Sequence, residues 1–307
     1  IAYTIYQLNK LKKLNCTLFC VSLHGPNKDI SLLSQQDSHI KPIQMDLSKN
    51  FKFNQPVDFI MHAACYAQPQ KFIENSLATI ELNITSTRKL LELAKKYHAR
   101  FMFFSSAEVY GDIPKDLIPV PETYNGNAST TTPRAVYGES KRLAETLCSI
   151  YRRDYNLQAY AVRISHVYGP GISKSDKRVL GDFIRKAMDE SKIALMDRGT
   201  AIKTFGYVAD IIVMLFTILL HGKDLIYNVG GIDSVSIRQL ADAVAAYYNI
   251  PVIVPEKPAK LLHIGTDPAI VKLDLTKYTK EFNPVAFISL EEGIRRMIDW
   301  NREALRT

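Results

Sequence analysis

Short apolar segments alternate with amphipathic helical segments over the first half of the chain. The strand-like apolar segments lie at 16–23, 40–45, 57–64, 100–106 and 158–167. Helices are predicted at 1–14, 77–97 and 135–155, where apolar residues recur at helical spacing or the segment is long and uninterrupted. Strands that alternate with helices of this length are typical of β-α-β units. The pattern therefore predicts an α/β fold built on a doubly wound parallel sheet.

The pattern changes after Gly171. Helices are predicted at 179–191, 208–221, 236–248 and 289–306, with a single strand at 225–229. We therefore expect a first domain over 1–167, to whose sheet 225–230 returns. A smaller, mostly helical lobe is expected over 168–307.

The beginning of the predicted sheet is incomplete. A doubly wound sheet that binds a dinucleotide opens with a strand and a glycine-rich turn, whose amides hold the pyrophosphate. Here the first predicted element is a helix, and the earliest glycine is Gly25. In the strand order 3-2-1-4-5-6 the absent strand is a central one, and its loss leaves two open edges. We expect an upstream strand and turn in the native chain; the alternative is a protein that has lost normal dinucleotide binding.

Composition and charge place the chain among globular proteins. Of 307 residues, 47% are hydrophobic and 23% are charged, which excludes a disordered or collagen-like chain. The net charge of +8 is compatible with a polyanionic partner, but the basic residues are scattered. We therefore expect a few contacts to the phosphates of a small molecule and no nucleic-acid partner.

Cysteine spacing and apolar run length bear on the cellular compartment. Cys16, Cys20 and His24 recur every four residues, but their segment is a predicted strand, so we expect free thiols and no metal site. The longest apolar run, 211–220, is too short to cross a bilayer. No signal peptide opens the sequence. These observations predict a cytoplasmic protein without a membrane partner.

One pair of residues indicates catalysis. Tyr137 and Lys141 are spaced to share one face of a predicted helix. An ammonium and a positively charged nicotinamide ring are expected to lower the pKa of the phenol, so that it can act as a base on a sugar hydroxyl. Ser105 and Ser106 end a predicted strand, where open α/β sheets place their active sites.

Around this pair the sequence resembles the extended short-chain dehydrogenase/reductase family, the epimerases and dehydratases of nucleotide sugars. The matching blocks are HAA at 62–64, ELNITST at 81–87, SSAEVYGD at 105–112, PETYNGN at 121–127, PRAVYGESKRLAETL at 133–147, VRISHVYGPG at 162–171 and YNVGG at 227–231. Two blocks, PETYNGN and PRAVYGESKR, are most similar to UDP-glucuronate decarboxylases. The resemblance implies a Rossmann-type sheet, an NAD cofactor (with NADP not excluded), a nucleotide-sugar substrate and a homodimer.

The resemblance also implies roles for individual residues. Tyr137 corresponds to the catalytic base, Lys141 to its partner, Ser106 to a hydroxyl that binds the sugar oxygen, and Glu108 to an acid near the sugar ring. The residues expected at the cofactor are Asp46, Leu47, Ala63, Ala64, Asn83, Ser105, Tyr137 and Lys141. The residues expected at the substrate are His166, Arg178 and Lys203.

Several positions depart from the decarboxylase pattern. Ala107 replaces a serine, and Lys203 replaces an arginine thought to bind the glucuronate carboxylate, an exchange that loses bidentate geometry. His166 replaces the usual asparagine, and Ser22 stands where an acidic residue commonly holds the ribose of NAD. The sequence therefore predicts an enzyme that acts through a 4-keto intermediate, as a decarboxylase or a dehydratase. The alternatives are an epimerase and a non-catalytic relative.

Overall fold

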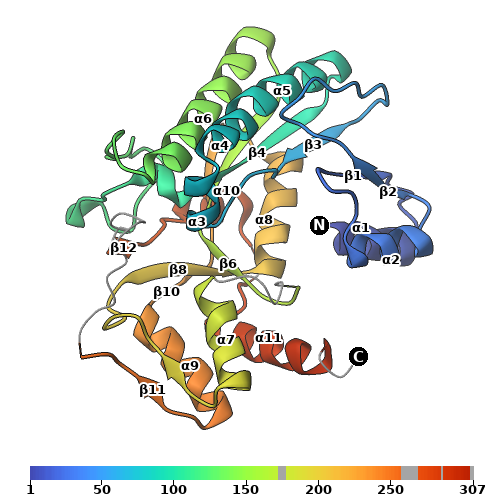
Figure 1. Cartoon of the computed structure of the whole chain (residues 1–307). Coiled ribbons are helices and arrows are strands. Elements are labelled where there is room, and N and C mark those ends of the chain that lie inside the picture. The colour runs from blue at the N-terminus through green and yellow to red at the C-terminus, as the bar shows by residue number, and fades with distance from the viewer. Residues whose placement is uncertain (172–177, 257–268, 285, 305–307) are drawn as a thin grey trace.

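Four parallel strands form the main sheet, in the order β3 (Phe59–His62), β4 (Arg100–Ser106), β5 (Ala159–Ile164) and β9 (Ile226–Val229). The structure is a computed structural model that describes residues 1–171, 178–256, 269–284 and 286–304. The predicted α/β class with parallel strands is confirmed by this sheet and the helices around it (Figure 1).

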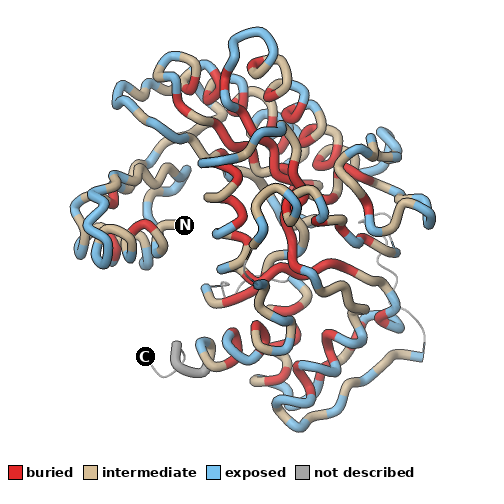
Figure 2. Tube along the Cα trace, turned by 180° about the vertical axis from the view of Figure 1, so that it is seen from behind, coloured by how far each residue is buried: buried red, intermediate tan, exposed pale blue. Residues whose placement is uncertain are grey.

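Helices cover both faces of the main sheet. Phe101 and Phe103 of β4 pack with α5 (Ser86–Tyr97) and α6 (Ala135–Tyr155), whereas Met102 packs with α8 (Val208–His221) on the other face. All three side chains are fully buried. A strand covered on both faces is apolar at successive positions, which explains the continuous apolar run in the sequence. Figure 2 shows the buried positions gathered in these strands and on the inner faces of the helices.

A second, two-stranded sheet stands beside the first. It pairs β1 (Leu18–Ser22) with β2 (Ile40–Gln44) and carries α1 (Ala2–Lys12) and α2 (Lys28–Gln36). Figure 1 shows it next to β3, but no described strand pairs with the free edge of β1 or of β3. Two open edges are the arrangement expected when the central first strand of such a sheet is absent.

The helix predicted as one element at 77–97 is divided. The segment runs through α3 (Pro69–Glu74), α4 (Ser76–Ile80), the π-helical turn η1 (Glu81–Thr85) and α5. The 3-10 turns η2 (Ala107–Tyr110) and η3 (Lys115–Leu117) follow β4. A π-turn often marks a functional position in a helix, because it frees a carbonyl from the regular ladder.

The C-terminal part contains more strand than the sequence predicted. There β8 (Ile202–Tyr207) pairs antiparallel with β10 (Asp233–Ser236) and parallel with β6 (His166–Tyr168) and β12 (Ile270–Val271). A short ladder joins β7 (Ile193–Ala194) and β11 (Val252–Ile253). The helices here are α7 (Val179–Asp189), α9 (Ile237–Tyr248), α10 (Thr276–Phe282) and α11 (Leu290–Ala304). None of the helices in the described ranges is both long and apolar enough to cross a membrane.

Candidate active site

The site is built at the carboxyl end of β4. The strand ends at Ser106, whose Oγ accepts a hydrogen bond from the backbone N–H of Glu108 at 3.3 Å. This N-cap turns the chain sharply into η2 and fixes Glu108 two residues beyond the strand. The carboxyl ends of parallel strands are where open α/β sheets bind ligands, so the position agrees with the sequence prediction.

Tyr137 lies in the first turn of α6 and reaches this strand end. Its side chain is 8% exposed and is hydrogen-bonded to Ser106. Burial raises the pKa of Tyr137 above its ordinary value, and the nearby Cys65 and Glu108 raise it further, whereas the Ser106 hydrogen bond and Arg178 lower it. The lowered pKa that the sequence predicts requires a nicotinamide ring as well as an ammonium, and in the protein chain alone the pKa of Tyr137 is raised. The removal of water from the phenol outweighs the positive charges of the described chain.

Lys141 lies one turn further along α6. Its Nζ donates a 2.6 Å hydrogen bond to the carbonyl of Phe104 and lies 5.5 Å from the centre of the Tyr137 ring. The side chain is 2% exposed, and burial lowers the pKa of Lys141 from its ordinary value. An ammonium that is buried beside the phenol stabilises a phenolate more strongly than it would in water.

Glu108 forms an ion pair with Arg134. Arg134 immediately precedes α6, and its carbonyl accepts the backbone N–H of Tyr137 at 3.1 Å. The side chain of Arg134 is 12% exposed and that of Glu108 is 29% exposed, so the pair is partly shielded from water. Arg134 lies within one of the matching sequence blocks, and the sequence predicted no role for it. Its place three residues before Tyr137, one helical turn, is the signal that would have indicated it.

The π-turn contacts α6 from the side. Asn83 Nδ2 donates a 2.9 Å hydrogen bond to Ser140 Oγ, which in turn donates to the Tyr137 carbonyl at 3.1 Å. The preceding carbonyl, of Leu82, lies 3.1 Å from His62 Nε2 at the end of β3. These bonds join β3, the π-turn and the catalytic turn of α6.

The nicotinamide end of a dinucleotide fits this site on its donors and acceptors. Asn83 Oδ1 is buried and has no hydrogen-bond partner among the described residues, and it lies on the residue that contacts Ser140. An amide or hydroxyl of a cofactor would supply the missing donor. No glycine-rich turn that could hold the pyrophosphate end lies among the described residues from α1 to β3.

The other residues expected at the cofactor lie after β2, after β3 and at the end of β4. Asp46 and Leu47 follow β2, and the Asp46 carboxylate accepts hydrogen bonds from the N–H and Oγ of Ser48, which lower its pKa. Ala63 and Ala64 follow β3. The hydroxyl of Ser105 donates to Glu145 Oε1 at 2.6 Å, so it is engaged under α6.

The residues expected at the substrate come from the C-terminal part and its border. Arg178 precedes α7 and is close enough to Tyr137 to lower its pKa. His166 is exposed on β6, with its ring centre 5.5 Å from that of Phe205 on β8. Lys203 lies on β8 and is 2% exposed. The described contacts therefore link Arg178 to the catalytic turn, and they place His166 and Lys203 on neighbouring strands.

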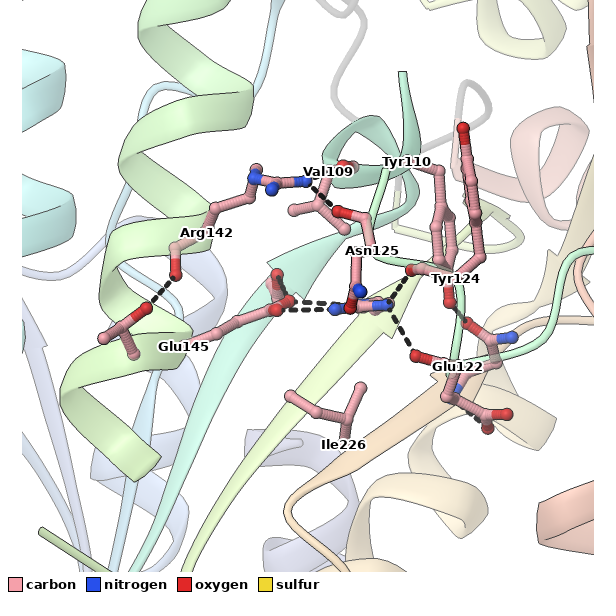
Figure 3. A network of polar contacts seen from close by, with 12 residues as sticks. Val109, Tyr110, Glu122, Tyr124, Asn125, Arg142, Glu145 and Ile226 are labelled. Carbon is pink, nitrogen blue, oxygen red and sulfur yellow. Dashed lines mark hydrogen bonds and ion pairs between the residues drawn. The ribbon is translucent and has the colours of Figure 1, made fainter. Parts of the chain in front are cut away.

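A network of polar contacts joins α6 to the neighbouring strand and loop (Figure 3). Arg163 of β5 binds the Glu145 carboxylate of α6 through Nε at 3.0 Å and Nη2 at 2.8 Å. Its Nη1 donates to the Glu122 carbonyl at 3.2 Å, and its guanidinium lies 4.7 Å from the Tyr110 ring centre. The network joins α6, β5 and the loop that follows η3. Within the described ranges, no group of three or more His, Cys, Asp or Glu side chains could hold a metal ion.

Comparisons with known proteins agree with this geometry at the level of the family. A model of the NAD dependent epimerase/dehydratase family matches residues 24–230. UDP-glucuronic acid decarboxylase 1 of Arabidopsis thaliana is 32% identical over 79% of this chain and 54% of its own length. The chain thus spans about half the length of that relative.

Solved structures show the same fold. The chain resembles Pal from Bacillus thuringiensis with a TM-score of 0.81 and 20% identity, over 98% of this chain and 96% of that one. It resembles MoeE5, solved in complex with UDP-glucuronic acid and NAD, with a TM-score of 0.77 and 19% identity, over 99% of this chain and 96% of that one. At these identities the likeness shows the fold alone.

Proposed function

The chain belongs to the NAD dependent epimerase/dehydratase family, and on that premise we propose that it converts a nucleotide sugar through a 4-keto intermediate. The substrate we put first is UDP-glucuronate, which the enzyme would decarboxylate. The observation that carries the proposal is the arrangement at the end of β4, where the Tyr137 hydroxyl is hydrogen-bonded to Ser106 and Lys141 Nζ lies 5.5 Å from its ring centre.

The first step needs a base and a hydrogen-bond donor at the sugar 4-oxygen. Tyr137 takes the proton of the 4-hydroxyl, Ser106 hydrogen-bonds the same oxygen, and Lys141 stabilises the phenolate that Tyr137 becomes when it has lost its own proton. A nicotinamide dinucleotide, when bound, accepts the hydride that leaves C4 and later returns it. In this proposal Lys141, Asn83 and Tyr137 hold the nicotinamide end.

The second step uses the 4-ketone as an electron sink. In a 4-keto glucuronate, the bond between C5 and C6 breaks, carbon dioxide leaves and the electron pair is delocalised onto the ketone oxygen. A proton is then added at C5. Glu108, which is paired with Arg134 and is close enough to raise the pKa of Tyr137, would manage this proton.

Dehydration is the second candidate function. Lys203 stands where decarboxylases have an arginine, and a lysine cannot bind a carboxylate through two parallel hydrogen bonds. In a 4-keto sugar with a hydroxyl at C6, Glu108 would instead take the proton from C5, and the C6 hydroxyl would leave, so that together one molecule of water is lost across C5 and C6. Simple epimerisation and a non-catalytic role remain further alternatives.

The domain roles follow from the same proposal. Residues 1–167, with 225–230, would hold the dinucleotide, and residues 168–307 would mainly hold the nucleotide sugar. Arg178, His166 and Lys203 would contact its diphosphate and sugar. We further propose that the protein is a cytoplasmic homodimer that uses NAD.

The experiment that tests the function is a product analysis. The full-length protein is incubated with NAD in three separate reactions that contain UDP-glucuronate, UDP-GlcNAc or dTDP-glucose. The masses of the products are measured by mass spectrometry. Loss of carbon dioxide from UDP-glucuronate supports decarboxylation, and loss of water from a neutral sugar supports dehydration. An unchanged mass with a new retention time indicates epimerisation. Unchanged substrate in every reaction would contradict the enzyme proposal.

A further inference from the structure

An aromatic ring lies flat against the candidate base. Phe72 of α3 stacks on Tyr137 with ring centres 4.7 Å apart and an angle of 18° between the planes. Phe72 is 1% exposed and Tyr137 is 8% exposed, so water has no access between the rings. The proposed reaction gives the Phe72 ring no role.

The backbone around Phe72 is fixed on both sides. Its N–H donates to the Gln68 carbonyl at 3.0 Å, and its carbonyl accepts from Thr79 Oγ1 at 3.5 Å. Thr79 is itself fully buried. Pro69 begins α3, where its ring favours the helical φ. The Phe72 ring therefore has little freedom to leave the Tyr137 face.

The same segment touches α6 at a second point. The chain continues from α3 through α4 into the π-turn, where Asn83 binds Ser140 Oγ at 2.9 Å. Ser140 Oγ donates to the Tyr137 carbonyl. One contact therefore acts on the tyrosine ring and the other on its backbone, and both come from residues 72–83.

Charged and titratable groups reach the phenol from other elements. Cys65 comes from the segment after β3, Glu108 from η2 and Arg178 from the start of α7, while Lys141 lies on α6 itself. The phenol hydroxyl is hydrogen-bonded to Ser106. Phe72 is the uncharged neighbour that covers a ring face.

We infer that Phe72 is a positioning residue for Tyr137. The Phe72 ring holds the phenol of Tyr137 in the plane that directs the phenol hydroxyl to Ser106, and it keeps water from the stacked face. Stacked aromatic rings fix relative orientation and add about 0.5–1.5 kcal/mol beyond buried area. Burial of the stacked face disfavours the charged phenolate relative to the neutral phenol.

Three variants separate positioning from packing. Phe72→Leu removes the ring but keeps an apolar side chain. Phe72→Tyr keeps a stacking ring and serves as the rescue variant. Phe101→Leu is the matched control, because Phe101 is equally buried on β4 but belongs to the cluster under α5 and α6.

The direct readout does not depend on the substrate. Tyrosine labelled with ¹³C at Cζ is titrated by NMR in the full chain, and the Tyr137 signal is identified by its loss in Tyr137→Phe. We expect Phe72→Leu to lower the midpoint of Tyr137, and we expect Phe72→Tyr and Phe101→Leu to leave it near the wild-type value. A midpoint in Phe72→Leu equal to that of the wild type would overturn the inference.

A second readout rests on the proposed function. In Phe72→Leu, kcat falls by about tenfold to a hundredfold, the range that a small misplacement of a reacting group costs, with little change in KM. Phe72→Tyr restores kcat. A Phe101→Leu loss of kcat as large as that of Phe72→Leu would overturn the positioning role. If the wild type turns over none of the substrates, the proposed function fails while the NMR titration still decides the role of Phe72.

Discussion

Glu145 on α6 and Arg163 on β5 form a two-point ion pair that is buried on both sides. The distances are 3.0 Å from Nε to Oε1 and 2.8 Å from Nη2 to Oε2, and the side chains are 10% and 8% exposed for Arg163 and Glu145. Glu145 lies two turns beyond Tyr137 and one turn beyond Lys141, on the same side of the helix. The pair therefore links the face of α6 that carries Tyr137 and Lys141 to β5 of the main sheet.

Replacement of Glu145 by glutamine should destabilise the protein by about 3–5 kcal/mol, because it leaves the Arg163 charge buried without its partner. Urea denaturation at pH 7 measures this. The matched control is Asp242→Asn, which removes one partner of the exposed Arg238–Asp242 pair and should cost at most about 0.5 kcal/mol. Equal losses in the two variants would show that burial of the first pair has no energetic consequence.

Local sequence patterns predicted the elements that carry the site. The predicted strand 100–106 and the predicted helix 135–155 have the bounds of β4 and α6, since each is a long, uniform segment. The absence of a glycine-rich turn before Gly25 likewise predicted the open edges of β1 and β3.

Three features of the site depend on contacts between residues far apart in the sequence, and local sequence patterns did not predict them. The segment 77–97 is interrupted at the π-turn, where His62 at the end of β3 lies 3.1 Å from the Leu82 carbonyl. The stacking of Phe72 on Tyr137 joins residues from different helices and has no local periodic signal. The raised pKa of Tyr137 arises from burial, which composition and spacing do not report.

Stability should fall in mildly acidic solution because of His62. Burial lowers the pKa of His62 to about 4 from its ordinary value, with a smaller lowering by Lys141. Between pH 6.5 and about 4 the unfolded chain binds a proton at this residue and the folded chain does not, so stability is lost as pH falls through this window. At about 1.4 kcal/mol for each pKa unit, the loss is roughly 3 kcal/mol.

The comparison of wild type with His62→Gln isolates this contribution. The free energy of unfolding is measured by urea at pH 7 and at pH 4.5, and the wild type should lose more than the variant. The subtraction removes the acid-sensitive carboxylates common to both proteins, such as Asp37 and Glu292. Parallel pH dependences for the two proteins would mean that His62 is not buried in its neutral form.

Ser106→Ala should weaken both the turn and the base. The change removes the N-cap acceptor for the Glu108 N–H, at a cost of about 1 kcal/mol. It also removes the hydrogen bond that lowers the pKa of Tyr137, so the phenol holds its proton to higher pH. The rising limb of the pH profile of kcat should therefore move to higher pH. A limb that stays in place while kcat falls would assign Ser106 to substrate binding alone.

Arg134 should matter through Glu108. Arg134→Gln removes the cation of the Glu108 ion pair, whereas Arg134→Lys keeps the charge and loses the planar guanidinium. If Glu108 manages the proton at C5, incorporation of deuterium from solvent at C5 of the product should slow in Arg134→Gln, with partial recovery in Arg134→Lys. Identical deuterium incorporation in wild type and Arg134→Gln would remove Arg134 from the proposed mechanism.

The most direct test of the central claim compares wild type and Tyr137→Phe in the conversion of UDP-glucuronate with NAD. Phenylalanine keeps the ring that stacks on Phe72 and removes only the hydroxyl bonded to Ser106, so the fold should be retained. We expect the wild type to form a product lighter by one carbon dioxide and the variant to form none, with unfolding curves that coincide. Turnover by Tyr137→Phe at the wild-type rate would contradict the assignment of Tyr137 as the base.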